Sequence, residues 1–260
     1  MGLKSCLRQL DKDTGFKIFS VIFIITSAVF LFWRAKFGFG YNDEAFIITL
    51  GERLFDGDAL FYDEWHLSQN FGVVMLPFFA FTKLFCLSND GIVLLLRYCY
   101  CVVWLSTCLG VYHVINKKYK SALLVYAYLI FFAPFDMMSI SYNSIGLMSV
   151  LLLCCVIYSI NGEEKCPLRY KIYFSLLWIV AALCSPLMAV IYVLSFAAVL
   201  IAAKFKKGYM ERVRSCYLFS GVVTAVAVII YFIVFIYTRA NMNNITEGFS
   251  YILNDPEHSS

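Results

Sequence analysis

Long apolar runs alternate with short polar connections along most of the chain. A helix needs about 20 apolar residues to cross a bilayer. By that rule the sequence predicts spans at about 17–34, 92–115, 121–136, 145–160 and 216–238. The stretch 172–203 is too long for one span and has Pro186 near its middle, so we expect two short spans joined by a tight turn. The pattern therefore predicts an all-α polytopic transmembrane helix bundle of about seven spans.

The apolar run 73–87 is an exception, because it is short and Pro77 interrupts it. If it crossed the membrane, the basic loops 116–120 and 204–214 would lie outside, although Lys and Arg are typical of cytoplasmic loops. We therefore expect 73–87 to lie against the outer face as a non-spanning or re-entrant element. The predicted order, within one transmembrane domain, is an inner tail (1–16), a first span (17–34), an outer loop with juxtamembrane helices (35–91), the remaining spans (92–238) and an outer tail (239–260).

Composition and charge support a membrane protein. The chain is 62% hydrophobic and 15% charged, whereas about a quarter of the residues of soluble domains are charged. With seven spans, most of the 21 Lys and Arg residues lie inside and most of the 17 Asp and Glu residues lie outside. The basic clusters then mark topology, and no nucleic-acid partner is expected. The ten cysteines form no C-x-x-C pair, so we interpret them mostly as small core residues.

Two adjacent carboxylates, Asp43 and Glu44, open a short amphipathic helix predicted at about 43–55. Asn42 can cap this helix, and Gly57 tolerates the left-handed conformation after its end. On a 3.6-residue period Asp43 lies on the apolar face, while Glu44 points about a quarter turn away. One interpretation is that both acids offset the helix dipole, by a few tenths to ~1 kcal/mol. The other is that an acid turned toward a membrane-side cavity serves a function, because burial there is costly.

Further polar side chains lie in the first outer loop and around a second outer turn. The loop contains His66 and Lys83, and the second turn contains Asp136, followed by Tyr142 and Asn143. We expect the two turns to face each other across one cavity, with these side chains in contact with a substrate. His66 is either a metal ligand or, with no second histidine in its loop, a hydrogen-bonded side chain.

The order of these features resembles the GT-C superfamily of polyprenol-dependent glycosyltransferases, especially its protein mannosyltransferases and aminoarabinose transferases. The resemblance covers about residues 15–200. It is carried by the pair Asp43-Glu44 after the first span, Leu54-Phe55-Asp56-Gly57-Asp58 at the end of the helix, a later apolar stretch, Gly91 and Arg97 at the start of the next span, a basic inner loop, and Asp136 at the second outer turn.

The resemblance implies an inverting sugar transfer from a polyprenyl-phosphate-linked donor to a lipid, glycan or protein acceptor. It would occur at the outer face of a membrane, which we expect to be the bacterial plasma membrane. Asp43 would accept the proton of the acceptor's hydroxyl group, which is a poor nucleophile without a base. Arg97 and Lys83 would stabilise the departing phosphate. Glu44 and Asp136 would shape the acceptor site or hold a divalent cation, the one cofactor left open.

Other interpretations remain open at this point. The main rival is a transporter or flippase for a lipid-linked or small substrate, which the break at Pro186 favours. Against it, the interiors of the predicted spans carry almost no charge. A catalytically silent accessory subunit is a further alternative, and Arg97 is equally well explained as a boundary residue that extends to the membrane surface. Members of the superfamily usually have more spans, so we expect the full protein to continue beyond Ser260.

Overall fold

A computed structural model describes residues 3–37, 42–63, 66, 68–85, 91–119, 121–133, 138–161, 163, 165–205 and 208–239, with the backbone alone for 3–13, 42 and 43. The regular elements are α1 (Leu3–Arg34), α2 (Asn42–Asp56), α3 (Phe71–Phe85), α4 (Ile92–Asn116), α5 (Ala122–Phe131), α6 (Tyr142–Ile160), α7 (Leu168–Cys184), α8 (Pro186–Phe205), α9 (Tyr209–Phe232) and the π-helical turn η2 (Ile233–Tyr237). The predicted all-α fold class is confirmed.

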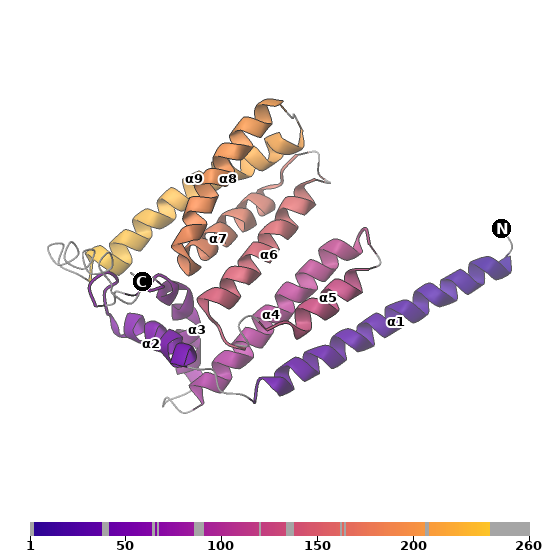
Figure 1. Ribbon diagram of the computed structural model, residues 1–260, viewed down its shortest axis with the longest axis horizontal. Helices are drawn as coiled ribbons and strands as arrows, with labels where there is room; N and C mark the ends of the chain where they lie inside the picture. Colours follow the sequence, from indigo (N-terminus) through magenta and orange to yellow (C-terminus); the bar gives the residue numbers. More distant parts are fainter. Residues whose placement is uncertain are drawn as a thin grey trace, which may run out of the picture.

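The long helices lie side by side, with α1 at one edge of the bundle and α8 and α9 at the other (Figure 1). Successive helices alternate in direction, so the α4–α5, α6–α7 and α8–α9 connections gather at one end (Figure 1). Helices α2 and α3 lie at the other end, together with the start of α6 and the α7–α8 junction. We call this the α2 end of the bundle.

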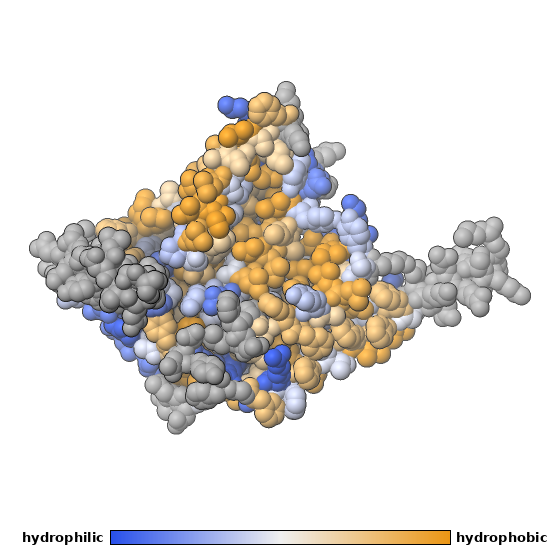
Figure 2. All heavy atoms as spheres, viewed as in Figure 1, coloured by the Kyte–Doolittle hydropathy of each residue, from blue (hydrophilic) through white to orange (hydrophobic). Residues whose placement is uncertain are grey.

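Five helices within the described residues are long and apolar enough to cross a membrane. They are Thr14–Arg34, Ile92–Asn116, Tyr142–Ile160, Pro186–Phe205 and Tyr209–Tyr237. Many of their large apolar side chains are exposed, and hydrophobic residues dominate the visible face of the bundle (Figure 2). The exposed apolar surface is suited to lipid rather than water. The chain is therefore a multi-pass helical membrane protein, while the total of seven spans stays a prediction.

The helix boundaries confirm one predicted span limit and correct another. The break at Pro186 is confirmed, because α7 ends at Cys184 and α8 begins at Pro186. Ser185 between them is extended (φ −151°, ψ 122°), and proline suits the first position of a helix. The span predicted at 121–136 is too long, since α5 ends at Phe131. A ten-residue helix measures about 15 Å, roughly half of the ~30 Å hydrocarbon core.

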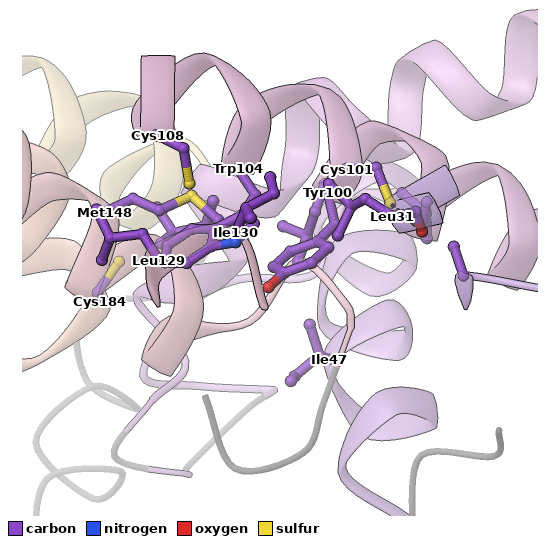
Figure 3. Close-up of a cluster of buried hydrophobic side chains, with 14 of the residues drawn as sticks. Leu31, Ile47, Tyr100, Cys101, Trp104, Cys108, Leu129, Ile130, Met148 and Cys184 are labelled. Atoms are coloured by element: carbon purple, nitrogen blue, oxygen red, sulfur yellow. Dashed lines mark hydrogen bonds between the residues drawn. The ribbon is translucent and has the colours of Figure 1, made fainter. Parts of the chain in front are cut away.

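Two groups of buried apolar side chains hold the bundle together. The first core joins helices α1 to α6 and includes Leu31, Ile47, Phe71, Tyr100, Trp104, Ile130 and Met148. Figure 3 shows part of it, with Trp104, Ile130 and Met148 close together and Cys184 reaching in from α7. The second core joins α6, α7 and α9 through Leu153, Val156, Ile160, Phe174, Trp178, Val213, Cys216 and Tyr217.

Candidate functional site

Glu44 and Arg97 form a buried ion pair between the first turn of α2 and the start of α4. Arg97 Nε donates to Glu44 Oε1 over 2.8 Å, and Nη2 donates to Oε2 over 2.6 Å. The two residues are 6% and 8% exposed. Both carboxylate oxygens therefore accept from one guanidinium, the bidentate geometry that gives strong charge-assisted hydrogen bonds. Arg97 Nη1 also donates to the carbonyl of Ala35 over 3.4 Å, so the pair links the end of α1 to α2 and α4.

The ion pair corrects the predicted orientation of α2. We expected Glu44 to point away from the apolar side, but it is buried on the same side as Ile47, Gly51 and Leu54. Arg97 compensates the cost of turning a carboxylate inward, which apolar periodicity alone does not reveal. The side chain of Asp43, the predicted base, lies outside the described residues, as does Asp136.

The geometry favours a positioning role for Glu44. Both oxygens of its carboxylate accept from one guanidinium, which fixes the position and orientation of the side chain. Glu44 therefore fixes the first turn of α2, in which Asp43 is its neighbour in sequence. The boundary interpretation of Arg97 is wrong, since its head group is buried against Glu44 rather than extended to a surface.

Lys83 lies in the last turn of α3 and contacts α2. Its Nζ atom is 3.8 Å from Glu52 Oε1, and both side chains are about a third exposed (30% and 31%). The ammonium also lies over the ring of Phe79, 5.1 Å from the centroid. The structure therefore places Lys83 at the α2–α3 interface, and its predicted contact with phosphate stays a prediction.

A cavity of about 650 Å³ opens at the α2 end of the bundle. It is lined by His66, Ser68, Tyr142, Asn143, Gly146, Leu147, Val150, Ala181, Cys184, Ser185, Pro186, Leu187 and Met188. The structure thus brings together three predicted substrate-binding residues, His66 from the first loop and Tyr142 and Asn143 from the second turn. Sequence reasoning missed Ser68 and Ser185, although Ser185 before Pro186 is a recognisable start signal for a helix.

The loop between α2 and α3 is shaped by hydrogen bonds from side chains to its own backbone. Gly57 after α2 has φ 110°, as expected for a residue in the left-handed region after a helix. The Ala59 N–H donates to Asp63 Oδ2 over 2.7 Å, and the Phe61 N–H donates to Gln69 Oε1 over 2.7 Å. Gln69 is 2% exposed. These bonds fold the chain back so that the segment before α3 reaches the cavity.

His66 is held in one orientation on the cavity wall. The Ser68 N–H donates to His66 Nδ1 over 3.1 Å, and the Ser68 hydroxyl lies 2.6 Å from the same atom. Because a backbone N–H can only donate, Nδ1 is the acceptor and the neutral ring carries its proton on Nε2. The edge of the ring meets Phe46 of α2, with centroids 4.8 Å apart. Within the described residues, no three His, Cys, Asp or Glu side chains are placed to hold a metal ion.

The N-termini of two helices open onto the cavity. Helix α6 begins at Tyr142 after a capping box, in which the Ser144 N–H donates to Ser141 Oγ and the Ser141 N–H donates to Ser144 Oγ. Helix α8 begins at Pro186 on another wall. First-turn N–H groups and the helix dipole both favour negative charge at such termini. The positive ends of two helix dipoles therefore face the cavity, while one first-turn N–H of α6 is already bonded to Ser141 and Pro186 has no N–H.

An apolar groove of about 480 Å³ lies on the other side of α7. It is lined by Phe61, Asn70, Val73, Ile179, Ala182, Leu183, Thr224, Ala227, Val228, Ile230, Tyr231 and Phe235. The Tyr231 hydroxyl donates to Asn70 Oδ1 over 2.6 Å, which joins α9 to the turn before α3. The last turn of α7 thus contributes to both hollows, with Ala181 and Cys184 facing the cavity and Ala182 and Leu183 facing the groove.

The fold and site together define a multi-pass helical membrane protein with a largely apolar cavity that carries a few polar side chains, beside an apolar groove. No protein-family model, curated protein or solved structure matches this chain significantly.

Proposed function

We propose that this protein is a membrane glycosyltransferase of the GT-C type that moves a sugar from a polyprenyl-phosphate-linked donor to an acceptor. The observation that carries the proposal is a cavity with a few polar side chains, among them His66, Asn143 and Ser185, set beside an apolar groove across the last turn of α7. A lipid-linked sugar pairs a polar sugar phosphate with a long apolar chain. The cavity would take the first part and the groove the start of the second.

The cavity supplies groups suited to a sugar phosphate. Hydroxyl, amide and imidazole groups of Ser68, Ser185, Asn143 and His66 suit sugar hydroxyls. The N-termini of α6 and α8 favour the phosphate. The predicted phosphate ligands Arg97 and Lys83 are not among the cavity-lining residues. Hydrogen bonds and helix dipoles would therefore stabilise the negative charge of the phosphate in the cavity.

In the proposed reaction Asp43 takes the proton of the acceptor's hydroxyl group as its oxygen attacks the anomeric carbon of the sugar. The bond between that carbon and the phosphate oxygen breaks, and polyprenyl phosphate leaves with the electron pair. The ion pair between Glu44 and Arg97 would hold the turn that carries Asp43. A divalent cation near the acidic loop stays an open part of the proposal.

The proposed orientation places the α2 end on the outer side of the bacterial plasma membrane. The opposite end carries Lys117 and Lys118 after α4, Lys165 before α7, Lys204 at the end of α8 and Arg214 near the start of α9. Clusters of Lys and Arg favour the cytoplasmic side. A lipid, glycan or protein acceptor would then be modified outside the cell.

The decisive test is the Asp43→Asn variant. Asparagine keeps the shape of the side chain but cannot take a proton, so we expect turnover to fall by about 10²–10⁴-fold. Glu44→Gln should weaken turnover less, and Glu52→Gln on the same helix serves as the control. Turnover of a labelled polyprenyl-phosphate sugar is measured in membranes matched for protein level. An Asp43→Asn variant that keeps more than about a tenth of the activity removes the base assignment, by the same rate arithmetic.

A transporter or flippase for a lipid-linked substrate is the second candidate. The observation that favours it is the interrupted helix pair α7 and α8, whose junction at Ser185 lines the cavity. Transporters often bind substrates at such broken helices. Purified protein in vesicles would separate the two functions, since a flippase moves the labelled lipid across the bilayer without an acceptor and leaves its sugar attached.

A further inference from the structure

Two cysteine thiols meet at the end of the bundle opposite α2. Cys166 lies in the connection between α6 and α7, and Cys216 lies in the second turn of α9. Their Sγ atoms are 3.1 Å apart although 50 residues separate them in sequence. Cys216 is fully buried in the second core, and Cys166 is half-buried. The interpretation of the cysteines as core residues did not anticipate this contact, because it joins distant segments.

We propose that Cys166 and Cys216 form a reversible disulfide that ties the α6–α7 connection to α9. The oxidant is a low-molecular-weight disulfide, for which glutathione disulfide is the probe. The thiolate of Cys166, the more exposed of the two, attacks it, forms a mixed disulfide and releases one glutathione thiolate. The Cys216 thiolate then attacks the Cys166 sulfur and releases the second. Two protein thiols are oxidised to one disulfide, and glutathione disulfide is reduced to two thiols.

The surrounding contacts keep the two sulfurs together. The Tyr209 hydroxyl, at the start of α9, donates to the carbonyl of Ile157 in α6 over 3.3 Å. Cys166, Tyr170 and Tyr209 all pack against the second core. A disulfide bond is about 2.05 Å long, so bond formation needs a shift of roughly 1 Å between segments that are already in contact. Within the described residues, no second pair of thiols is in such contact.

Charge at this end favours the proposed oxidant. Around Cys166 the three bases Lys165, Arg169 and Lys171 outnumber the two acids Glu163 and Glu164. Glutathione disulfide carries a net negative charge, so the small positive excess attracts it. In a reducing cytoplasm the pair would rest as two thiols and would oxidise only when the thiol pool becomes oxidised.

The experiment counts thiols in the full chain held in membranes. The protein is incubated with glutathione disulfide, denatured and labelled with a maleimide. Its intact mass is then measured by mass spectrometry. We expect the wild type to lose two labelled thiols, to gain no glutathione, and to yield one disulfide-linked peptide pair containing Cys166 and Cys216. Dithiothreitol should restore both labels. Cys154→Ser, which removes an exposed thiol of α6, is the control and should still form the disulfide.

Three variants at the two cysteines make the outcome decisive. Cys216→Ser should stop at the mixed disulfide, so that Cys166 carries one glutathione, and Cys166→Ser should show no paired loss of thiols. Cys166→Ala repeats the second test with an apolar side chain. Full labelling of the oxidised wild type, a stable glutathione adduct on its Cys166, or a paired loss that persists in Cys166→Ser would each overturn the proposal. None of these readouts depends on glycosyltransferase activity.

Discussion

The two cores of the bundle differ in the polar contacts that accompany their apolar side chains. Beside the first core lies the buried pair of Glu44 and Arg97, and Ser27 Oγ meets the Tyr126 hydroxyl across 3.0 Å inside it. The second core is mainly a stack of rings. Phe174 and Tyr217 meet edge to face with centroids 4.8 Å apart, and Phe196 stacks on Tyr217 at 5.5 Å. Both cores also contain ring pairs and hydroxyl hydrogen bonds, so the difference between them lies in the buried ion pair beside the first core.

The difference matches the position of the candidate site. Cavity residues come from the loop before α3, from α6 and from the α7–α8 junction, and the first core reaches this part of α6 and α7 through Ile145, Met148 and Cys184. A bidentate ion pair fixes both distance and angle, whereas ring contacts tolerate several offsets. We therefore expect single changes near the first core to have larger effects than polar changes in the second.

The largest effect is expected for Arg97→Ala. The change leaves the Glu44 carboxylate buried without its guanidinium, which typically costs about 3–5 kcal/mol of the free energy of unfolding. Lys83→Ala is the matched control, since Lys83 and Glu52 are 3.8 Å apart and partly exposed, and such a pair is worth about 1 kcal/mol or less. The midpoint of thermal unfolding in lipid nanodiscs, followed by tryptophan fluorescence, measures both.

Exchange of the two charges tests whether a restored ion pair at this position recovers stability. The double variant Glu44→Arg with Arg97→Glu should recover part of the lost stability, because it restores a buried pair of opposite charges. Equal midpoints for Arg97→Ala and Lys83→Ala would show that the buried pair does not position the first core.

An intermediate effect is expected for Gly51→Ala at the α2–α3 contact. A Cβ atom on Gly51 would lie 2.8 Å from Met75 Cγ and 3.3 Å from Phe79 Cβ. Overpacking of this kind costs about 1–3 kcal/mol, partly offset by the ~1 kcal/mol advantage of alanine over glycine in a helix. Gly15→Ala in α1 has no atom within 4 Å of the added Cβ and should be neutral or stabilising. If both variants shift the midpoint equally, α2 and α3 are not in close contact.

Much of the fold followed from local signals in the sequence. The helix predicted at 43–55 is α2, Asn42–Asp56, and Gly57 after it has the expected positive φ. The break at Pro186 was also predicted, because proline acts on its immediate neighbours. The end of α5 at Phe131 was missed, since the apolar run continues past the helix and hydropathy does not mark where the backbone leaves the α region.

The contacts that define the site were harder to predict. Glu44 and Arg97 are 53 residues apart, and nothing in either local pattern indicates that they pair. The sequence predicted only that the loops carrying His66 and Asn143 would face each other. Ser185 lines the same cavity because α7 packs against α6. Such long-range partners are set by tertiary packing, which the periodicity of one helix does not contain.

The smallest effect is expected for Tyr217→Phe in the second core. The change removes the hydrogen bond from the Tyr217 hydroxyl to Ser195 Oγ, which is 2.8 Å long, and keeps the ring. Such a bond contributes about 0.5–1.5 kcal/mol. The loss should fall at the low end, because Ser195 still donates to the carbonyl of Tyr192 over 2.9 Å. Tyr217→Leu is the companion variant, and it should cost more because it removes ring contacts worth about 0.5–1.5 kcal/mol for each aromatic pair. If Tyr217→Phe lowered the unfolding midpoint as far as Arg97→Ala, directional polar contacts would hold the second core as well, and the contrast between the two cores would fail.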